Sequence, residues 1–402
     1  MIPSQIADQL DLTDPLALTQ ALIRCRSVTP TDDGAIDLVA GLLTRLGFTC
    51  HTMTFGEGTE GTNAAIRNLY ARRDGSKAEE GQCFAFAGHT DVVPPGDEAA
   101  WRIPPFDASV TEDGWLIGRG SADMKGNIAA FISATAAAVA DGTADKGALS
   151  FIITGDEEGP ALNGTTKILD WMADRGEQFD LCLVGEPTGV EKLGDTIKIG
   201  RRGSFTAKLT VTGVQGHVAY PHRADNPLHP LVRMLNTLVA EPLDDGTEHF
   251  ESSTLQITTI DVDNPAHNVI PSTGTATFNS RFNDLHTAES LEAEIRRRLD
   301  SVGVPYDLSI RVSAHPFLTQ PNEAIAAVVG AIEESTGLRP EMTTGGGTSD
   351  ARFITRMGPV FEFGLIGDTI HQVDERVPAH DLQRLSDAYY RIIERFFALP
   401  AN

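Results

Sequence analysis

Residues 82–91 read QCFAFAGHTD, an apolar run that closes on a glycine, a histidine and an aspartate. Two similar runs follow, ALSFIITG at 148–155 and DLCLVGE at 180–186. Short apolar runs closed by glycine are typical of buried strands in a central sheet. Between the first two lies MKGNIAAFISATAAAVADG at 124–142, whose alanine-rich composition favours a well-packed helix. Strands that alternate with helices predict a layered α/β domain.

Side chains that bind metals or move protons stand where these strands end. His89 ends the first run, and Glu186 follows the third. The adjacent carboxylates Glu157 and Glu158 follow the second. Asp91 is spaced to hold the second ring nitrogen of His89, as carboxylates beside metal-binding histidines do. Because ligands of open α/β sheets bind at the carboxyl ends of the strands, we expect these segments to form one site.

Each of these residues, taken singly, has an ordinary structural explanation. Asp123 in GSADMKG suits a helix N-cap, and a lone Glu186 or His371 suits a loop. Glu157 and Glu158 are more telling, because adjacent carboxylates repel each other unless a cation separates their roles. One then binds metal while the other moves protons. The set as a whole supplies the ligand types and the number that two zinc ions need.

Composition limits the class of protein. A chain of 402 residues with 41% hydrophobic content can bury a large core and divide into two or more domains. Lys and Arg number 32 against 56 Asp and Glu, and the net charge of -24 opposes binding to nucleic acid or anionic membranes. The four cysteines show no CxxC spacing, and we find neither a signal peptide nor a run of about 18 apolar residues. We therefore expect a cytoplasmic protein with reduced thiols.

The pattern changes near residue 199 to strands that alternate with two helices. We expect an inserted α+β domain at 199–315, large enough to fold by itself, between two parts of a catalytic dinuclear-metal domain at 1–198 and 316–402. His371 in the last part would close the metal site. The expected later elements are strands 204–213, 253–262, 274–282 and 306–314, and helices 226–241, 287–303, 323–337 and 382–398.

Eight longer motifs contain these segments or lie between them. They are GHTDVVPPGD (88–97), GRGSADMKG (118–126), TGDEEGPALNGT (154–165), VGEPT (184–188), GRRGS (200–204), GHVAYPHRADNPLHP (216–230), NVIP (268–271) and GGTSDARF (346–353). Together they resemble the metallopeptidase-like dinuclear zinc amidohydrolases. The resemblance runs from about residue 10 to the C-terminus and implies a zinc-exopeptidase-like domain, whose central mixed sheet is flanked by helices, with an inserted α+β dimerisation domain. It therefore also implies a homodimer.

The resemblance also implies a ligand set. His89 and Glu186 would bind one zinc ion, and Glu158 and His371 would bind the other. Asp123 would bridge both ions, with the peptide bond after it in the cis form. Co2+ is expected to substitute for Zn2+.

Further roles follow from the same resemblance. Glu157 would be the general acid and base, and Asp91 would orient His89. His217 would reach the active site of the other protomer as an oxyanion donor. Relatives often carry Thr or Asn where this chain has His267, so the contact at that position stays open.

The implied reaction is hydrolysis of the amide bond of an N-succinyl amino acid with several carboxylates. Arginine suits such a substrate, because its planar fork holds a carboxylate through two hydrogen bonds. The alternative is an N-acetylornithine deacetylase or another N-acyl amino acid amidohydrolase. A binding protein without activity would be expected to lack Glu157 or a ligand, and a dinucleotide-binding dehydrogenase would need a third glycine after Gly118-Arg119-Gly120. The expected substrate contacts are Arg201, Asn268, Arg281, Gly347 and Thr348.

Overall fold

The computed structural model describes residues 6–77 and 82–400, which form two units. The expected insert at 199–315 differs from the second unit, which continues to Leu318 and also takes up Thr343–Thr348. Two hydrogen bonds tie this added segment to the second unit: Arg201 donates from Nη1 to the Gly347 carbonyl at 2.8 Å, and the Thr344 hydroxyl donates to the His249 carbonyl at 2.6 Å. The roles of the units in catalysis and dimerisation stay predictions. The first unit is Met1–Ile199, Thr319–Met342 and Ser349–Asn402, and the second is Gly200–Leu318 and Thr343–Thr348.

A mixed sheet of eight strands forms the centre of the first unit as far as it is described. Strands β3, β6 and β7 are the three apolar runs predicted from the sequence, and they are parallel and buried along their whole length. Their carboxyl ends therefore meet at one edge of the sheet. The strands, in spatial order, are β1 (Thr49–Phe55), β2 (Ile66–Asp74), β6 (Ala148–Thr154), β3 (Cys83–His89), β7 (Leu181–Val184), β18 (Val360–Glu362), β8 (Thr196–Lys198) and β17 (Glu341–Thr343).

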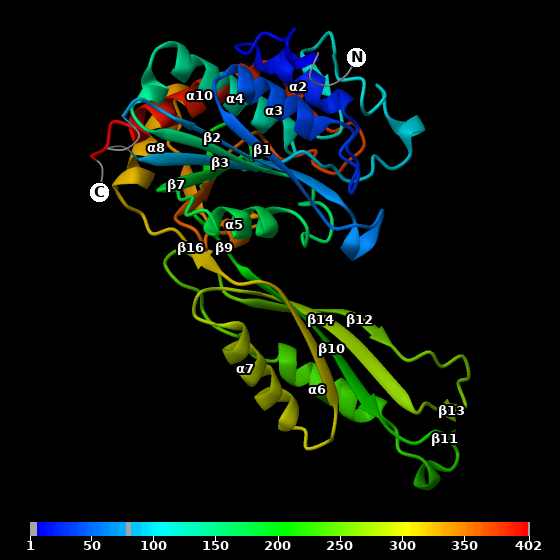
Figure 1. Cartoon of the computed structure of the whole chain (residues 1–402). Helices are drawn as coiled ribbons and strands as arrows, with labels where there is room; N and C mark the ends of the chain where they lie inside the picture. The colour runs from blue at the N-terminus through cyan, green and yellow to red at the C-terminus, as the bar shows by residue number, and fades with distance from the viewer. Residues whose placement is uncertain (1–5, 78–81, 401–402) are drawn as a thin grey trace. The chain divides into compact units, whose positions relative to one another are not determined.

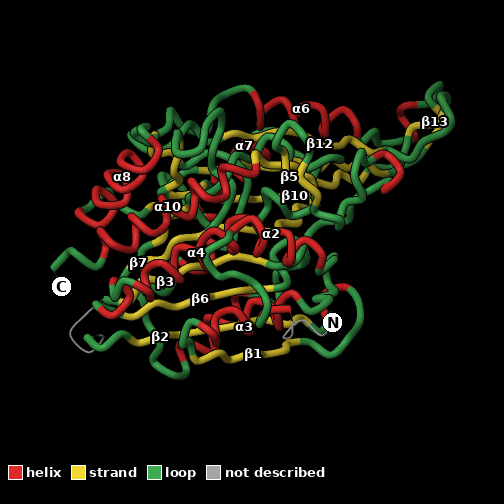
Figure 2. The backbone as a smooth tube through the Cα atoms, turned by 90° about the horizontal axis from the view of Figure 1, so that it is seen from above, coloured by secondary structure: helices red, strands yellow, loops and turns green. Residues whose placement is uncertain are grey.

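Helices cover both faces of this sheet. Helices α2 (Pro15–Arg24), α3 (Ala35–Arg45), α4 (Lys125–Ala140) and α10 (Ala379–Phe396) lie on one face, and α5 (Thr165–Ala173) lies on the other (Figure 1). Seen from above, α3 lies over β1 and β2, and α4 lies beside β3 (Figure 2). Helix α4 is buried nearly all round, which explains its alanine-rich composition. The predicted mixed sheet flanked by helices is confirmed.

None of the helices in the described part of the chain has the length and apolar character of a membrane span.

Further elements complete the first unit. The remaining elements are helices α8 (Glu323–Thr336) and α9 (Ala351–Ile354), the three-stranded sheet of β19 (Arg376–Pro378), β5 (Trp115–Ile117) and β4 (Ser109–Val110), and the 3-10 helices η1 (Gly61–Asn63), η2 (Glu98–Ala100) and η3 (Thr143–Asp145).

The second unit is an antiparallel sheet with two helices on one face. Alternate residues of β14 are buried, so one face of that strand packs against the helices. The sheet, in spatial order, is β12 (Thr254–Asp261), β14 (Thr273–Phe282), β10 (Gly203–Thr212) and β15 (Asp307–Ala314), and the helices are α6 (Leu228–Val239) and α7 (Ala288–Asp300). Two short pairs, β9 (Gly200–Arg201) with β16 (Phe317–Leu318) and β11 (Gly216–His217) with β13 (Val269–Ile270), and the 3-10 helix η4 (Pro221–Arg223) complete it.

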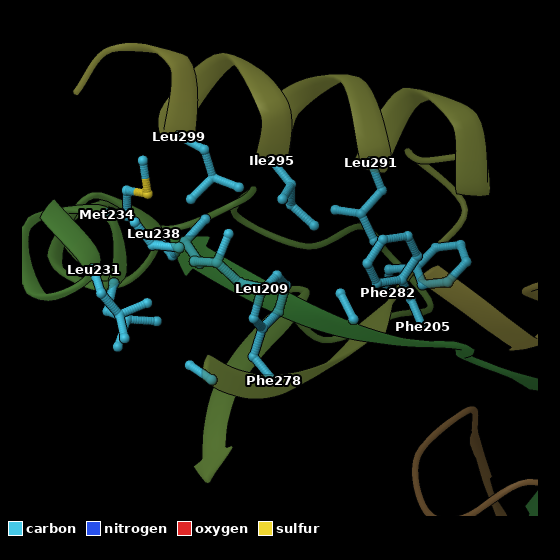
Figure 3. Packing of buried hydrophobic residues seen from close by; sticks show 14 of the residues in the cluster. Phe205, Leu209, Leu231, Met234, Leu238, Phe278, Phe282, Leu291, Ile295 and Leu299 are labelled. Atoms are coloured by element: carbon cyan, nitrogen blue, oxygen red, sulfur yellow. The ribbon is translucent and has the colours of Figure 1, made fainter. Parts of the chain in front are cut away.

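Replacing Phe278 with alanine is expected to destabilise the second unit by about 3 to 5 kcal/mol. Phe278 is 0% exposed and belongs to the cluster that fills the space between the sheet and the helices (Figure 3). The measurement is urea unfolding followed by circular dichroism. The control is Thr277→Ala, one position earlier on the other face of the strand. A loss of less than about 1 kcal/mol for Phe278→Ala would contradict this view of the core.

Candidate metal centre

Predicted metal ligands meet at the carboxyl end of β3. The ligand atoms of His89, Asp123 and Glu158 all lie within 4.8 Å of one another. Nε2 of His89 is 3.1 Å from Oδ1 of Asp123. His371, from the loop after β18, joins them, since its Nε2 is 2.8 Å from Oε1 of Glu158 and 3.4 Å from Oδ2 of Asp123. Each carboxylate oxygen of Asp123 therefore faces a different histidine.

This arrangement fits a pair of metal ions. Histidine nitrogens and carboxylate oxygens are donors that zinc prefers, and ligand atoms around a tetrahedral zinc ion lie roughly 3.3 to 3.6 Å apart. The separations between Asp123 and the two histidines are close to that range. The fifth predicted ligand, Glu186, lines a small pocket together with His89 and Glu157. The donors are thus present on both sides of Asp123.

The backbone of Asp91, and not the expected carboxylate, makes the close contact with His89. Nδ1 of His89 lies 2.9 Å from the Asp91 carbonyl oxygen, whereas the nearest recorded carboxylate oxygen is 3.7 Å away. A carbonyl only accepts, so Nδ1 carries a proton. Nε2 faces Oδ1 of Asp123 and would offer its lone pair to a metal once it has given up its own proton. The Asp91 carboxylate accepts the backbone N–H groups of Glu157 at 3.2 Å and Glu158 at 3.0 Å. Asp91 thus positions three site residues at once.

The start of helix α4 packs directly against the end of β3. The Asp123–Met124 peptide is cis, as expected. The backbone N–H of His89 points to the Met124 sulfur at 3.1 Å. A Cβ atom at Gly88 would lie only 2.5 Å from that sulfur. Glycine at this position therefore allows the histidine and the aspartate to come from touching segments.

The pKa values of Glu157 and Asp123 shift in opposite directions. Burial raises the pKa of Glu157 well above its ordinary value, the positive charge of His89 opposes this, and the negative charges of Glu186 and Asp350 add to it. Burial acts in the same direction on Asp123, but hydrogen bonds from both histidines hold its pKa below the usual range. In the protein without metal, Glu157 is therefore suited to hold a proton beside a carboxylate that stays ionised.

Zinc binding is expected to release protons. In the protein without metal, hydrogen bonds with Asp123 and Glu158 raise the pKa of His371 to about 10, so the imidazole is protonated at neutral pH. A metal needs its neutral nitrogen. The metal-bound state then holds fewer protons, and zinc affinity should rise with pH until about pH 10. Calorimetric titrations in two buffers of different ionisation enthalpy should show release of about one proton or more per subunit. A binding heat that is independent of the buffer would contradict this.

His217 and Asn268 come together in the second unit. His217 ends β11 and pairs with Val269 of β13, and the N–H of Val218 donates to the Asn268 carbonyl at 3.1 Å. The N–H of Ala219 donates to Nδ1 of His217 at 3.1 Å. Nε2 of His217 therefore carries the proton and is available as a donor. Both side chains are exposed.

The remaining predicted substrate contacts also lie in the second unit. Arg201 is buried and holds the Gly347 carbonyl, and Gly347 and Thr348 are exposed. Arg281 lies on β14, where burial and the positive charge of Arg202 lower its pKa. Two neighbouring cations suit the binding of an anion. The approach of all these residues to the metal centre stays a prediction.

Two buried carboxylates at the centre were not found by sequence reasoning. Asp350 lines the same pocket as Glu157 and accepts the hydroxyl of Thr165 at 2.6 Å. Glu375 is 0% exposed and accepts backbone N–H groups of the turn that carries Asp123. Asp350 lies inside the motif GGTSDARF (346–353), and Glu375 follows His371 by four positions. Nothing local distinguishes such a carboxylate from one in solvent.

Comparison with known proteins identifies the family to which this chain belongs. Residues 85–395 match peptidase family M20/M25/M40, and the chain belongs to this family. A succinyl-diaminopimelate desuccinylase of Rhodospirillum centenum is 55% identical over 386 residues, which cover 96% of this chain and 98% of that protein. The predicted family resemblance is confirmed.

Solved structures show the same fold. The aminopeptidase PepT of Bacillus cereus has a TM-score of 0.77 at 18% identity, over 96% of this chain and 99% of that one. A dinuclear metal binding peptidase of the M20 family from Bacillus subtilis has a TM-score of 0.68 at 14% identity, over 95% of this chain and 97% of that one. At such low identity, these likenesses support the fold alone.

Proposed function

We propose that the protein hydrolyses the amide bond of N-succinyl-LL-2,6-diaminopimelate to succinate and LL-2,6-diaminopimelate, a step of diaminopimelate and lysine biosynthesis. The observation that carries this proposal is Asp123, whose two oxygens face His89 and His371, while Glu157 lines a small pocket together with His89. The relative from Rhodospirillum centenum, similar over nearly the full length, supports the choice of substrate.

The cofactors that we propose are two Zn2+ ions per subunit, with Co2+ able to replace them. His89 and Glu186 would hold one ion, Glu158 and His371 the other, and Asp123 both. When bound, such ions polarise an amide carbonyl and lower the pKa of water. The nitrogen and oxygen donors of the centre suit this chemistry.

Glu157 would move the proton. It takes a proton from the attacking water while the water oxygen bonds to the succinyl carbonyl carbon. The carbon–nitrogen bond then breaks, and Glu157 returns the proton to the departing amine. Burial raises the pKa of Glu157 in the protein without metal, and the positive charge of two bound ions would lower it again, so that the carboxylate could take up a proton and release it.

The second unit would form the homodimer and complete the site. His217 of the partner subunit would donate from Nε2 to the oxyanion, and the hydrogen bond that Nδ1 accepts supports this tautomer. Arginine forks and backbone groups would bind the substrate's carboxylates and amide. The described cysteines are free thiols, which agrees with the cytoplasm as the proposed compartment. The proposed substrate contacts are Arg201, Asn268, Arg281, Gly347 and Thr348.

A side-by-side turnover assay tests the function. With zinc supplied, kcat/KM for N-succinyl-LL-diaminopimelate is expected to exceed that for N-acetylornithine by ~10^4-fold, because a site built for a distant carboxylate leaves its donors unpaired with an acetyl group. The metal-chelated protein is the blank. A preference for N-acetylornithine would instead support the alternative function, that of an N-acetylornithine deacetylase.

A further inference from the structure

A buried ion pair joins two segments of the metal centre that are far apart in sequence. Nη1 of Arg119 lies 2.7 Å from Oε2 of Glu375, and their side chains are 2% and 0% exposed. The proposed reaction assigns no role to either residue. Burying two charges costs free energy unless good geometry and further hydrogen bonds compensate. The partners of this pair therefore indicate what it does.

Glu375 gathers the backbone of the turn that carries the bridging aspartate. Its Oε2 accepts the N–H of Gly120 at 3.0 Å. Its Oε1 accepts the N–H groups of Ala122 at 3.0 Å and Asp123 at 3.1 Å. Together with Arg119, these donors occupy both oxygens of the carboxylate. The backbone of Asp123 is thus held directly by Glu375.

Arg119 holds the segment that carries the second histidine. Its Nη1 donates to the Gln372 carbonyl at 3.3 Å, and its Nη2 points to the His371 carbonyl at 3.4 Å. His371 has a φ of 61°, in the left-handed region that is unfavourable for residues other than glycine. Such a backbone persists only when its surroundings hold it. Nη2 also reaches the Pro94 carbonyl, in the loop after β3, at 3.4 Å.

We propose that Arg119 and Glu375 are positioning residues of the dinuclear metal centre, with Glu375 placing Asp123 and Arg119 placing His371. The pair thereby sets the affinity for metal. This inference rests on the proposed metal centre and adds two residues that bind no metal themselves. A pair that served only the stability of the fold would leave metal affinity unchanged.

Zinc titration of the metal-free protein against a chromophoric chelator tests the proposal without substrate. Glu375→Gln replaces an acceptor oxygen with an NH2 group that faces backbone N–H groups. Because Asp123 contributes to both ions, both binding steps should weaken ~10- to 100-fold. Arg119→Lys keeps the charge, but one ammonium cannot serve Glu375 and the carbonyls around His371 together. In the Arg119→Lys variant, mainly one of the two zinc-binding steps should therefore weaken, namely that of the ion that His371 would bind.

The matched control is Arg73→Lys, in the same unit. Nη2 of Arg73 pairs with Asp145 at 2.7 Å, and Nη1 holds the Ala144 carbonyl at 3.0 Å, but these partners carry no predicted ligand. Its zinc affinity should equal that of the wild type. Circular dichroism checks the fold of each metal-free variant, and the absorption spectrum of the Co2+ form reports the ligand geometry. We expect an altered spectrum for Arg119→Lys and Glu375→Gln alone.

The proposal is overturned if both pair variants bind two zinc ions with wild-type affinity and give the wild-type Co2+ spectrum, even where their melting temperatures fall. Should Glu375→Gln not fold, the milder Arg119→Lys decides, through the weakening or preservation of its binding steps. A wild-type protein that binds no zinc tightly would instead contradict the proposed metal centre, so the two failures are distinguishable.

Discussion

Replacing Glu157 with glutamine is expected to lower kcat for N-succinyl-LL-diaminopimelate by ~10^2- to 10^4-fold while two zinc ions remain bound. An amide cannot take the proton of the attacking water. The backbone N–H of Glu157 would still be held by Asp91, so the neighbouring ligands keep their places. The measurements are kcat, KM and the zinc content of the purified variant. The loss should fall on kcat, because the proton moves during the chemical step.

The adjacent carboxylate provides the contrast. Glu158→Gln should lose metal, since a carboxylate oxygen of Glu158 is one of the clustered ligand atoms and its Oε1 lies 2.8 Å from Nε2 of His371. Turnover near the wild-type value for Glu157→Gln would remove Glu157 from the acid and base role. Loss of zinc from the Glu157→Gln variant would indicate that Glu157 is a metal ligand.

Replacing His217 with alanine is expected to lower kcat by ~10^2- to 10^3-fold without loss of metal, because the variant would lack the donor that we propose for the oxyanion. Steady-state kinetics and zinc content again provide the measurement. His229→Ala is the control, since His229 is an exposed histidine on α6 of the same unit. An unchanged kcat for His217→Ala would contradict the oxyanion role.

Mixing the two inactive proteins tests whether the site is shared between subunits. A heterodimer of His217→Ala and Glu157→Gln protomers has one site that combines Glu157 with His217 of the partner subunit. If subunits exchange freely at equal amounts, activity should recover to about one quarter of the wild-type value. Analytical ultracentrifugation verifies the dimer. A mixture that exchanges subunits but stays inactive would contradict the shared site.

Local pattern was sufficient to predict the framework of the first unit. Strands β3, β6 and β7 are buried on both faces, so each is a continuous apolar run. Helix α4 is buried nearly all round, and its alanine-rich segment reflects this. Ligand segments at the ends of such strands were predicted to meet, because parallel strands end at one edge of a sheet. His89, Asp123, Glu158 and His371 do meet there.

Long-range packing decided the rest. The sequence placed the carboxylate of Asp91 on His89, but the fold brings the backbone carbonyl of Asp91 to the histidine and the carboxylate to the N–H groups of two glutamates. The fold also places Thr343–Thr348 in the second unit, whereas the sequence predicted that this segment belongs to the catalytic domain.

The sequence by itself determined the class of protein, its main elements and the side chains able to bind metal, because burial and ligand chemistry leave marks on neighbouring residues. Only the tertiary structure decided which groups hold those ligands in place. Arg119 and Glu375 are 256 positions apart, and their hydrogen bonds go largely to backbone groups, whose chemistry is the same at almost every residue. No local pattern encodes such a partner, so it is known only once the chain has folded.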